Sequence, residues 1–291
     1  MLDFFIHEGP RLVFVLACFS AVLGACIGSF LNVCIWRIPR DESVVAPRSH
    51  CPACNRLIPW YLNIPVLSWV MLRGRCRWCR QPISARYIGV ELLTAALFCI
   101  VFLQYAFERP MLGMVPLVDA ALIPVYWIFL AALVCGTFVD LDHMILPDSV
   151  TIGGMIAGPI FSALVPAMHH GETVWYRGLL ASGIGEAAGF GLLFLVAVLG
   201  EKVFKKEAMG FGDVKLMGAV GAFLGWQAVL FVLIVGSLVG SVVGVTLILL
   251  KKTELQGRIP FGPYLSLGAV IWVFWGQRIL DGYIDIFLPV M

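Results

Sequence analysis

Two short stretches of the sequence place carboxylic acids directly beside long apolar runs. FVDLDHMILPD at residues 138–148 contains Asp140, Asp142 and Asp148, and GFGDVK at residues 210–215 contains Asp213. An ionised aspartate at the centre of a bilayer costs about 2.5 to 3.5 kcal/mol and less near the surface, so such residues usually face a polar cavity or a partner. We therefore treat these acids as candidates for chemistry.

Two carboxyl groups, one from each stretch, suit the chemistry of an aspartic peptidase. Like charges a few ångströms apart do not both ionise readily, so the pair holds one proton between its members. The ionised member then activates a water molecule against a peptide carbonyl, and the protonated member donates to the carbonyl oxygen. The sequence offers no serine or cysteine nucleophile with a suitable histidine as a competitor, and His143 is interpreted as an interfacial residue.

Simpler roles for the same acids stay open at this point. Asp213 can pair with Lys215 or cap its own helix, and Asp148 is expected to cap the helix that begins at PDSVT. Paired acids near glycines are also typical of an ion-coupled or proton-coupled transporter, which would place them near the membrane midplane. A third alternative is a zinc-ribbon scaffold with a membrane anchor, for which the acids would tolerate replacement by asparagine.

A second motif consists of two Cys-x-x-Cys pairs, CPAC at residues 51–54 and CRWC at residues 76–79. Four thiolates in two such pairs match a tetrahedral structural zinc site, and a polar loop too small for a hydrophobic core would gain folding free energy from the metal. Two disulfides or four free thiols are the alternatives, and a reducing cytoplasm disfavours disulfides. We predict Zn²⁺ held by Cys51, Cys54, Cys76 and Cys79.

The composition predicts that membrane helices position both motifs. Hydrophobic residues make up 60% of the 291 residues and charged residues 13%, against about 25% charged in soluble domains. Unpaired backbone groups are costly in lipid, and the long runs lack the alternation of barrel strands, so we expect an all-α polytopic protein. The expected spans, each near the roughly 20 residues that cross a bilayer, are residues 12–36, 88–107, 117–138, 149–167, 178–200, 211–224, 227–250 and 261–277.

Glycine-rich stretches within these runs, GSLVGSVVG and GIGEAAGFG, are expected to let neighbouring helices pack closely. The first run is expected to be an uncleaved helix, because the residues before it lack the basic head of a signal peptide. We expect three parts: residues 1–38 with the first membrane helix, residues 39–86 as a cytoplasmic zinc-binding loop domain, and residues 87–291 as a multi-helix membrane domain.

Basic residues predict the orientation. Arginines concentrate between the first two helices, and lysines and arginines recur in alternate later loops, which places residues 37–86, 139–148 and 201–209 in the cytoplasm and both termini outside. Lipid headgroups are a plausible partner of the basic loop, and no interleaving of basic and aromatic residues indicates nucleic acid. The residues behind this prediction are Arg37, Arg40, Arg48, Arg56, Arg73, Arg75, Arg77, Arg80, Arg86, Lys202, Lys205, Lys206, Lys251, Lys252 and Arg258, against Arg11, Arg109, Arg177 and Arg278.

Over nearly its full length the chain resembles the bacterial type IV prepilin peptidases. The resemblance rests on the two cysteine pairs with NIPVLSW between them, and on GSFLNVCIWRIPR, RYIGVELL, DLDHMILPD, GFGDVKL and IPFGPYL. In this family of inner-membrane enzymes, the first acid of the D-x7-D stretch and the aspartate of GxGD are catalytic, which implies Asp140 and Asp213 here. The residues alone do not choose Asp140 over Asp142.

The resemblance also implies substrates and a second activity. Family members cut the short basic leader of prepilins and pseudopilins after a glycine on the cytoplasmic side, then methylate the new N-terminus with S-adenosylmethionine. Members with the cysteine loop are usually bifunctional. The sequence identifies no residue that binds the methyl donor, does not assign the chain to a pilus or a secretion system, and does not fix the oligomeric state.

Overall fold

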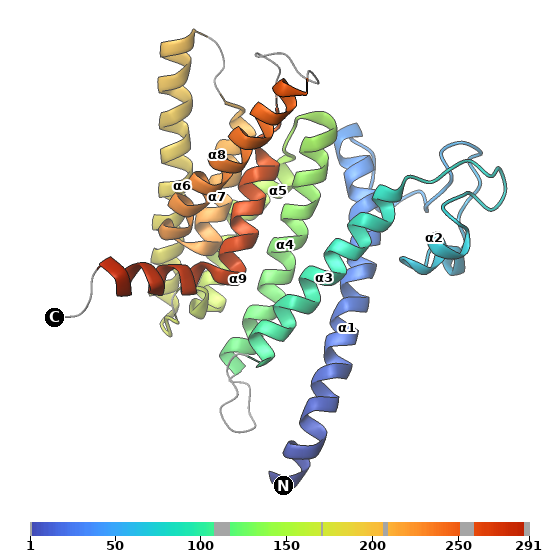
Figure 1. Cartoon of the computed structure of the whole chain (residues 1–291), viewed down its shortest axis with the longest axis horizontal. Helices are drawn as coiled ribbons and strands as arrows, with labels where there is room; N and C mark the ends of the chain where they lie inside the picture. Colours follow the sequence, from blue (N-terminus) through green and yellow to red (C-terminus); the bar gives the residue numbers. More distant parts are fainter. Residues whose placement is uncertain (1, 108–116, 170, 206–208, 251–258, 288–291) are drawn as a thin grey trace. The chain divides into compact units, whose positions relative to one another are not determined.

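The computed structural model describes residues 2–107, 117–169, 171–205, 209–250 and 259–287. Within these ranges the chain is almost entirely helical and contains no strand, only the isolated bridges His50–Leu57 and Arg75–Pro82 (Figure 1). The predicted all-α class is therefore confirmed. Some basic residues used for the orientation lie outside the described residues: Arg109, Lys206, Lys251, Lys252 and Arg258.

The N-terminal unit comprises residues 1–135 and is built on two long helices, α1 (Leu2–Arg37) and α3 (Ala85–Phe107). They pack closely at Gly24 and Gly28 of α1, where an added Cβ would lie 2.7 Å from the carbonyl oxygen of Thr94 and 2.8 Å from the Cα of Glu91. Between them runs the cysteine loop, which contains the short helix α2 (Leu67–Met71) and two 3₁₀ turns. The helix α4 (Leu117–His143) begins in this unit.

The C-terminal unit comprises residues 136–291, with α5 (Asp148–Leu164), α6 (Trp175–Phe204), α7 (Phe211–Leu224), α8 (Trp226–Leu249) and α9 (Gly262–Phe287). Its central helix is α7, which is buried from Asp213 to Leu224 except at Lys215. On one side an added Cβ at Gly189 of α6 would lie 2.1 Å from the carbonyl oxygen of Met217, and on the other a Cβ at Gly158 of α5 would lie 2.5 Å from Cβ of Ala222. Small residues therefore permit close packing, as the sequence predicts.

Each of the eight predicted runs coincides with a helix in the described part of the chain. Five of these helices are long and apolar enough to cross a membrane, namely those at 11–40, 85–105, 120–143, 175–203 and 226–249, which supports a membrane protein. The helices α5 and α7 have only 17 and 14 residues, fewer than the roughly 20 that span a bilayer. The count of eight spans stays a prediction.

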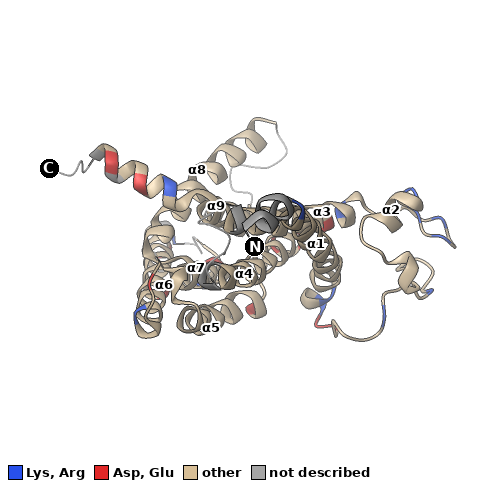
Figure 2. Cartoon of the chain, turned by 90° about the horizontal axis from the view of Figure 1, so that it is seen from below, with Lys and Arg blue, Asp and Glu red and all other residues tan. Residues whose placement is uncertain are grey.

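The helix α9 differs from its predicted run, since it continues to Phe287 rather than ending at residue 277. Figure 1 shows α9 changing direction along its length, and its later part carries Arg278, Asp281 and Asp285. In Figure 2 the coloured charges lie mostly on the cysteine loop, near helix ends and on this part of α9, whereas most of the ribbon is uncharged. The prediction ended the run at residue 277 because it followed apolar residues, and the residues of this extension are both polar and apolar.

Candidate functional site

Asp140 lies near the end of α4, where the apolar run changes to DLDH, and its side chain is buried. The backbone N–H of Gly262, the first residue of α9, donates a hydrogen bond to Oδ2 of Asp140 at 3.1 Å. The first N–H groups of a helix have no partner within it, and a helix N-terminus favours negative charge. The start of α9 therefore orients the Asp140 carboxylate and offsets part of the cost of burying its ionised form.

Asp213 lies in the first turn of α7 and is also buried, with 8% of its surface exposed. Its Oδ2 lies beside Gly210, where an added Cβ would be 3.4 Å away. The carboxyl groups of Asp140 and Asp213 are close enough to interact electrostatically. The structure thus brings together the two acids that the family resemblance selects, at a helix end and a helix start rather than at helix midpoints.

Leu146 is a residue of this site that the sequence did not reveal. Added Cβ atoms at Gly136, Gly212 and Gly262 would lie 3.5, 3.0 and 3.2 Å from its side chain. Leu146 therefore lies where α4, α7 and α9 approach one another, beside the glycine that binds Asp140 and the glycine that precedes Asp213. The glycines were visible in the sequence, but nothing local indicated that one leucine contacts all three.

The neighbouring acids have other positions. Asp142 is exposed, which separates it from the buried Asp140. Lys215 pairs with the carboxylate of Asp148, so the alternative in which Lys215 pairs with Asp213 is wrong. Residues two positions apart on a helix do not face each other, which explains why Lys215 turns away from Asp213.

The expected helix caps are also wrong. The N-cap residue of α5 is Pro147 and that of α7 is Gly210, and neither helix has a side-chain hydrogen bond at its cap. Asp148 is the first residue of α5 and its carboxylate binds Lys215 instead. The pair links the starts of α5 and α7, which places Asp148 in a structural role.

A buried serine–histidine pair also occurs in the C-terminal unit. Oγ of Ser162 and Nε2 of His169 lie 2.9 Å apart, and the two residues are 0% and 4% exposed. Ser162 is near the end of α5, about 20 Å along the helix from Asp148 at the rise of 1.5 Å per residue. Because a nucleophile must be reached by substrate, this burial favours a structural role for the pair and leaves the aspartates as the candidate centre.

The four cysteines of the N-terminal unit come together in two similar turns. In the first, the N–H of Cys51 donates to the carbonyl of Arg56 and the N–H of Asn55 to that of Cys51, with φ of 54° at Asn55. In the second, Cys76 donates to Gln81 and Arg80 donates to Cys76, with φ of 61° at Arg80. Each turn directs its two sulfur atoms toward the same point, although the residues between the two cysteines differ from one turn to the other.

The sulfur positions fit a tetrahedral metal. The Sγ atoms of Cys51, Cys54, Cys76 and Cys79 all lie within 4.8 Å of one another, and those of Cys51 and Cys79 are 3.8 Å apart. Four sulfurs at about 2.3 Å from a zinc ion are separated by about 3.8 Å. All four are free cysteines, which excludes the disulfide alternative in this structure. The backbone N–H of Cys79 lowers the pKa of Cys76 to about 6, whereas burial and the neighbouring sulfurs raise the pKa of Cys79 to about 11, so the adjacent sulfurs share their protons.

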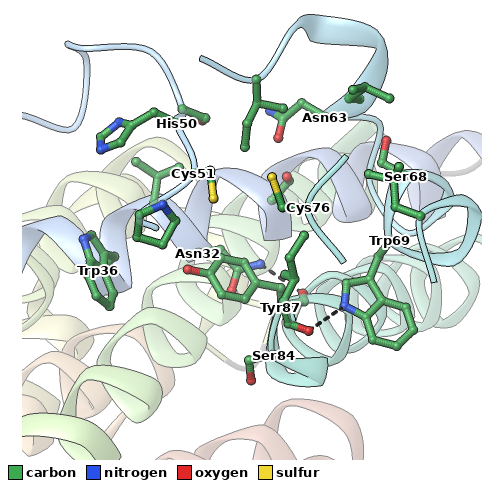
Figure 3. A pocket seen from close by; sticks show the side chains of 18 of the residues that line it. Asn32, Trp36, His50, Cys51, Asn63, Ser68, Trp69, Cys76, Ser84 and Tyr87 are labelled. Carbon is green, nitrogen blue, oxygen red and sulfur yellow. Dashed lines mark hydrogen bonds between the residues drawn. The ribbon is translucent and has the colours of Figure 1, made fainter. Parts of the chain in front are cut away.

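Figure 3 shows that Cys51 and Cys76 also border a pocket, with Asn32, Trp36 and Tyr87 on the opposite wall. The lining comes from α1, the cysteine loop and α3, all within the N-terminal unit. Two of the four cysteines thus belong to the wall of the pocket as well as to the cysteine centre.

Comparison with known proteins gives two matching family models. The Bacterial Peptidase A24 N-terminal domain matches residues 22–105, which include the four cysteines, and the Type IV leader peptidase family matches residues 127–245, which include Asp140 and Asp213. No solved structure gives a significant match.

Three relatives share the name prepilin leader peptidase/N-methyltransferase. The one from Aeromonas hydrophila is 40% identical over 306 residues and covers 97% of this chain and 97% of its own. The one from Myxococcus xanthus is 43% identical over 233 residues, 80% of this chain and 63% of the relative. The one from Stutzerimonas stutzeri is 32% identical over 304 residues, 97% of both chains.

Proposed function

We propose that this chain, which belongs to the family of prepilin leader peptidases/N-methyltransferases, removes the leader peptide from prepilins and methylates the N-terminus that the cut exposes. The observation that carries the peptidase half is the convergence of two buried carboxyl groups, Asp140 and Asp213, within electrostatic reach of each other. Two such groups supply a base and an acid from identical side chains.

The proposed cleavage uses one ionised and one protonated carboxyl group. The ionised member takes a proton from water as the water oxygen bonds to the peptide carbonyl carbon, while the protonated member donates to the carbonyl oxygen. The tetrahedral intermediate then loses the amine, which takes a proton as the C–N bond breaks. The hydrogen bond from Gly262 favours ionised Asp140, which assigns Asp213 as the initial acid.

The proposed second reaction transfers a methyl group to the amine released by the first. The amine nitrogen forms a bond to the methyl carbon of S-adenosylmethionine, the C–S electrons stay on sulfur as a thioether, and the nitrogen loses a proton to solvent.

For the cysteine centre we propose Zn²⁺, because four convergent sulfurs with tetrahedral spacing are its usual structural ligands. Such a metal would fix the loop at residues 39–86.

The proposed location is the bacterial inner membrane with the dyad on the cytoplasmic side. The basic residues of the cysteine loop support this side. The substrate suits it as well, since a prepilin carries a basic leader on an apolar helix and is cut where that helix meets the cytoplasm. The transporter alternative has no support, because the acids lie at helix ends and the relatives are named as peptidases.

The test is cleavage of a purified prepilin by the parent protein and by Asp140→Asn, Asp213→Asn and Asp142→Asn, with S-adenosylmethionine present and products weighed by mass spectrometry. Loss of the catalytic carboxylate is expected to slow cleavage by about a thousandfold or more, whereas the exposed Asp142 is expected to tolerate the change. The parent product is expected to gain one methyl group.

A pre-cut pilin is the control for folding. If Asp140→Asn and Asp213→Asn still methylate pre-cut pilin, their loss of cleavage is a loss of chemistry rather than of structure. Normal cleavage by either variant would overturn the assignment of that aspartate.

A further inference from the structure

Ser266 is a buried residue of α9 whose side chain has no hydrogen-bond partner. It is 3% exposed, and its Oγ is the one buried side-chain nitrogen or oxygen atom, among the described residues, that makes no hydrogen bond. A buried hydroxyl without a partner destabilises a fold, so in native proteins such a group usually binds another polar atom or an ordered water molecule. The peptidase chemistry described above does not use Ser266.

Other hydroxyl groups in the helices of this chain show the bond that Ser266 lacks. A serine or threonine in a helix often donates to the carbonyl oxygen four residues earlier. Four of them do so here at 2.7 to 3.2 Å, namely Ser20 to Leu16, Thr94 to Val90, Thr151 to Pro147 and Thr246 to Val242. The equivalent carbonyl for Ser266 is that of Gly262, and Ser266 does not bond to it. Its hydroxyl therefore remains available to another group.

The side of α9 that carries Ser266 is the side that meets Asp140. Gly262 and Ser266 are four residues apart, so they are neighbours on one face of the helix. An added Cβ at Gly262 would lie 2.7 Å from Oδ2 of Asp140. The same face continues through Ala269 and Val273, which are both buried. Because helical side chains lean toward the N-terminus of their helix, the Ser266 hydroxyl is directed toward the turn that binds Asp140.

The space between the Ser266 hydroxyl and the Asp140 carboxylate suits one water molecule. One turn of α9, a rise of about 6 Å over four residues, separates Ser266 from Gly262, and the lean of the serine side chain shortens this gap. Gly262 has no side chain to cover the hydroxyl. Polar groups just too far apart for a direct bond are often bridged by water, and a buried water needs two to four polar partners. Ser266 and the carboxyl groups of Asp140 and Asp213 are such partners.

We propose that Ser266 is a positioning residue of the peptidase site, where its hydroxyl donates to a water molecule that in turn donates to the Asp140 carboxylate. The inference rests on the proposed peptidase function and adds a residue to its site. A buried ionised carboxylate needs several hydrogen bonds to offset its lost hydration, and Gly262 supplies only one. Ser266 supplies a second through the water and does not itself contact the substrate.

The test compares prepilin cleavage by the parent and by Ser266→Ala. Alanine removes the hydroxyl, keeps a small side chain and suits a helix. We expect kcat at neutral pH to fall by about tenfold, since hydrogen bonds to charged groups are among the stronger ones. KM is expected to stay unchanged, because the groups that bind prepilin are intact. The thermal unfolding midpoint in detergent is expected not to fall, because no bond between protein groups is lost.

Ser182→Ala is the matched control. Ser182 is a buried serine of the same unit, and its hydroxyl donates to the carbonyl oxygen of Ala222 at 2.8 Å. Ala222 is nine residues after Asp213 on α7, about 13 Å along the helix. This variant is therefore expected to lower the unfolding midpoint and to keep the parental kcat, which is the opposite of the result expected for Ser266→Ala.

The pH dependence of kcat separates positioning from packing. Loss of a donor disfavours the ionised carboxylate, so its ionisation requires a higher pH. The acid limb of the profile is therefore expected to move up by about one pH unit in Ser266→Ala, which corresponds to a tenfold change. The titratable group that interacts with Asp140 from α7 is Asp213, which is unchanged in this variant, and Lys215 stays paired with Asp148.

Three results would overturn the proposal. The first is a parental kcat and pH profile in Ser266→Ala. The second is a lower kcat together with a lower unfolding midpoint, which would make Ser266 a packing residue. The third is a lower kcat with an unshifted acid limb, which would place the hydroxyl against the substrate. Failure of the parent to cleave any prepilin would instead refute the proposed peptidase function.

Discussion

The backbone N–H of Gly262 donates a hydrogen bond to Oδ2 of Asp140, which joins residues 122 positions apart in the sequence. Gly262 begins α9 and Asp140 lies near the end of α4, so the bond fixes a carboxylate at a helix N-terminus. An added Cβ at Gly262 would lie only 2.7 Å from the same Oδ2. The short IPFGPYL stretch therefore has a role in the site that its apolar composition does not suggest.

Gly262→Ala is expected to reduce prepilin cleavage by about ten- to a hundredfold, because the new methyl group displaces the Asp140 carboxylate and a misplaced catalytic group loses about that much rate. The control is Gly282→Ala in the same helix, where an added Cβ has no atom within 4 Å. Cleavage assays at saturating prepilin compare the two. Full activity in Gly262→Ala would show that the carboxylate tolerates this displacement.

Leu146→Ala is expected to lower both stability and cleavage, because the leucine fills the space between glycines of α4, α7 and α9. Loss of a buried leucine side chain typically costs about 2 to 5 kcal/mol in a core that does not collapse. The matched control is Ile145→Ala, since Ile145 is 59% exposed. Thermal unfolding in detergent measures the effect, and an unchanged midpoint for Leu146→Ala would contradict it.

The helices were predictable from the sequence because each depends on a local run of apolar residues, and even the short α7 was found with its bounds. The cysteine centre was predictable because four residues at characteristic spacings carry the whole signal. The sequence predicted that one acid from each of the two stretches would pair, but the choice of Asp140 came from the resemblance, since no local pattern distinguishes Asp140 from Asp142. Their difference in burial arises from packing around α9.

Contacts between distant residues account for what the sequence did not predict. Lys215 pairs with Asp148, 67 residues away, rather than with its neighbour Asp213. The contact of Glu91 with Val66 depends on a backbone turn with positive φ at a valine, which no propensity favours. Contacts of this kind depend on how separate segments pack against one another, and the periodicity of apolar residues within one helix does not predict that packing.

The pair of Lys215 and Asp148 is expected to contribute little to stability. The Asp148 side chain is 64% exposed, and exposed pairs usually contribute about 0 to 1 kcal/mol. Lys215→Met, Asp148→Asn and the double variant form a cycle that measures the coupling in unfolding free energy. Cleavage is expected to fall by a few-fold at most in each. A hundredfold loss in Asp148→Asn alone would show that this acid acts in the reaction.

The cysteine centre is expected to hold about one zinc ion per chain, measured by plasma mass spectrometry on protein purified without chelator. Cys51→Ser and Cys76→Ser each remove a ligand from one of the two turns and are expected to lose the metal. Cys99→Ser, in the membrane helix α3, is the control and is expected to retain it. Because Asp140 and Asp213 lie in the other unit, metal loss is expected to weaken methylation of pre-cut pilin more than prepilin cleavage. Equal loss of both activities would show that the metal supports the fold of the whole chain, and full metal content in both serine variants would exclude the four-cysteine site.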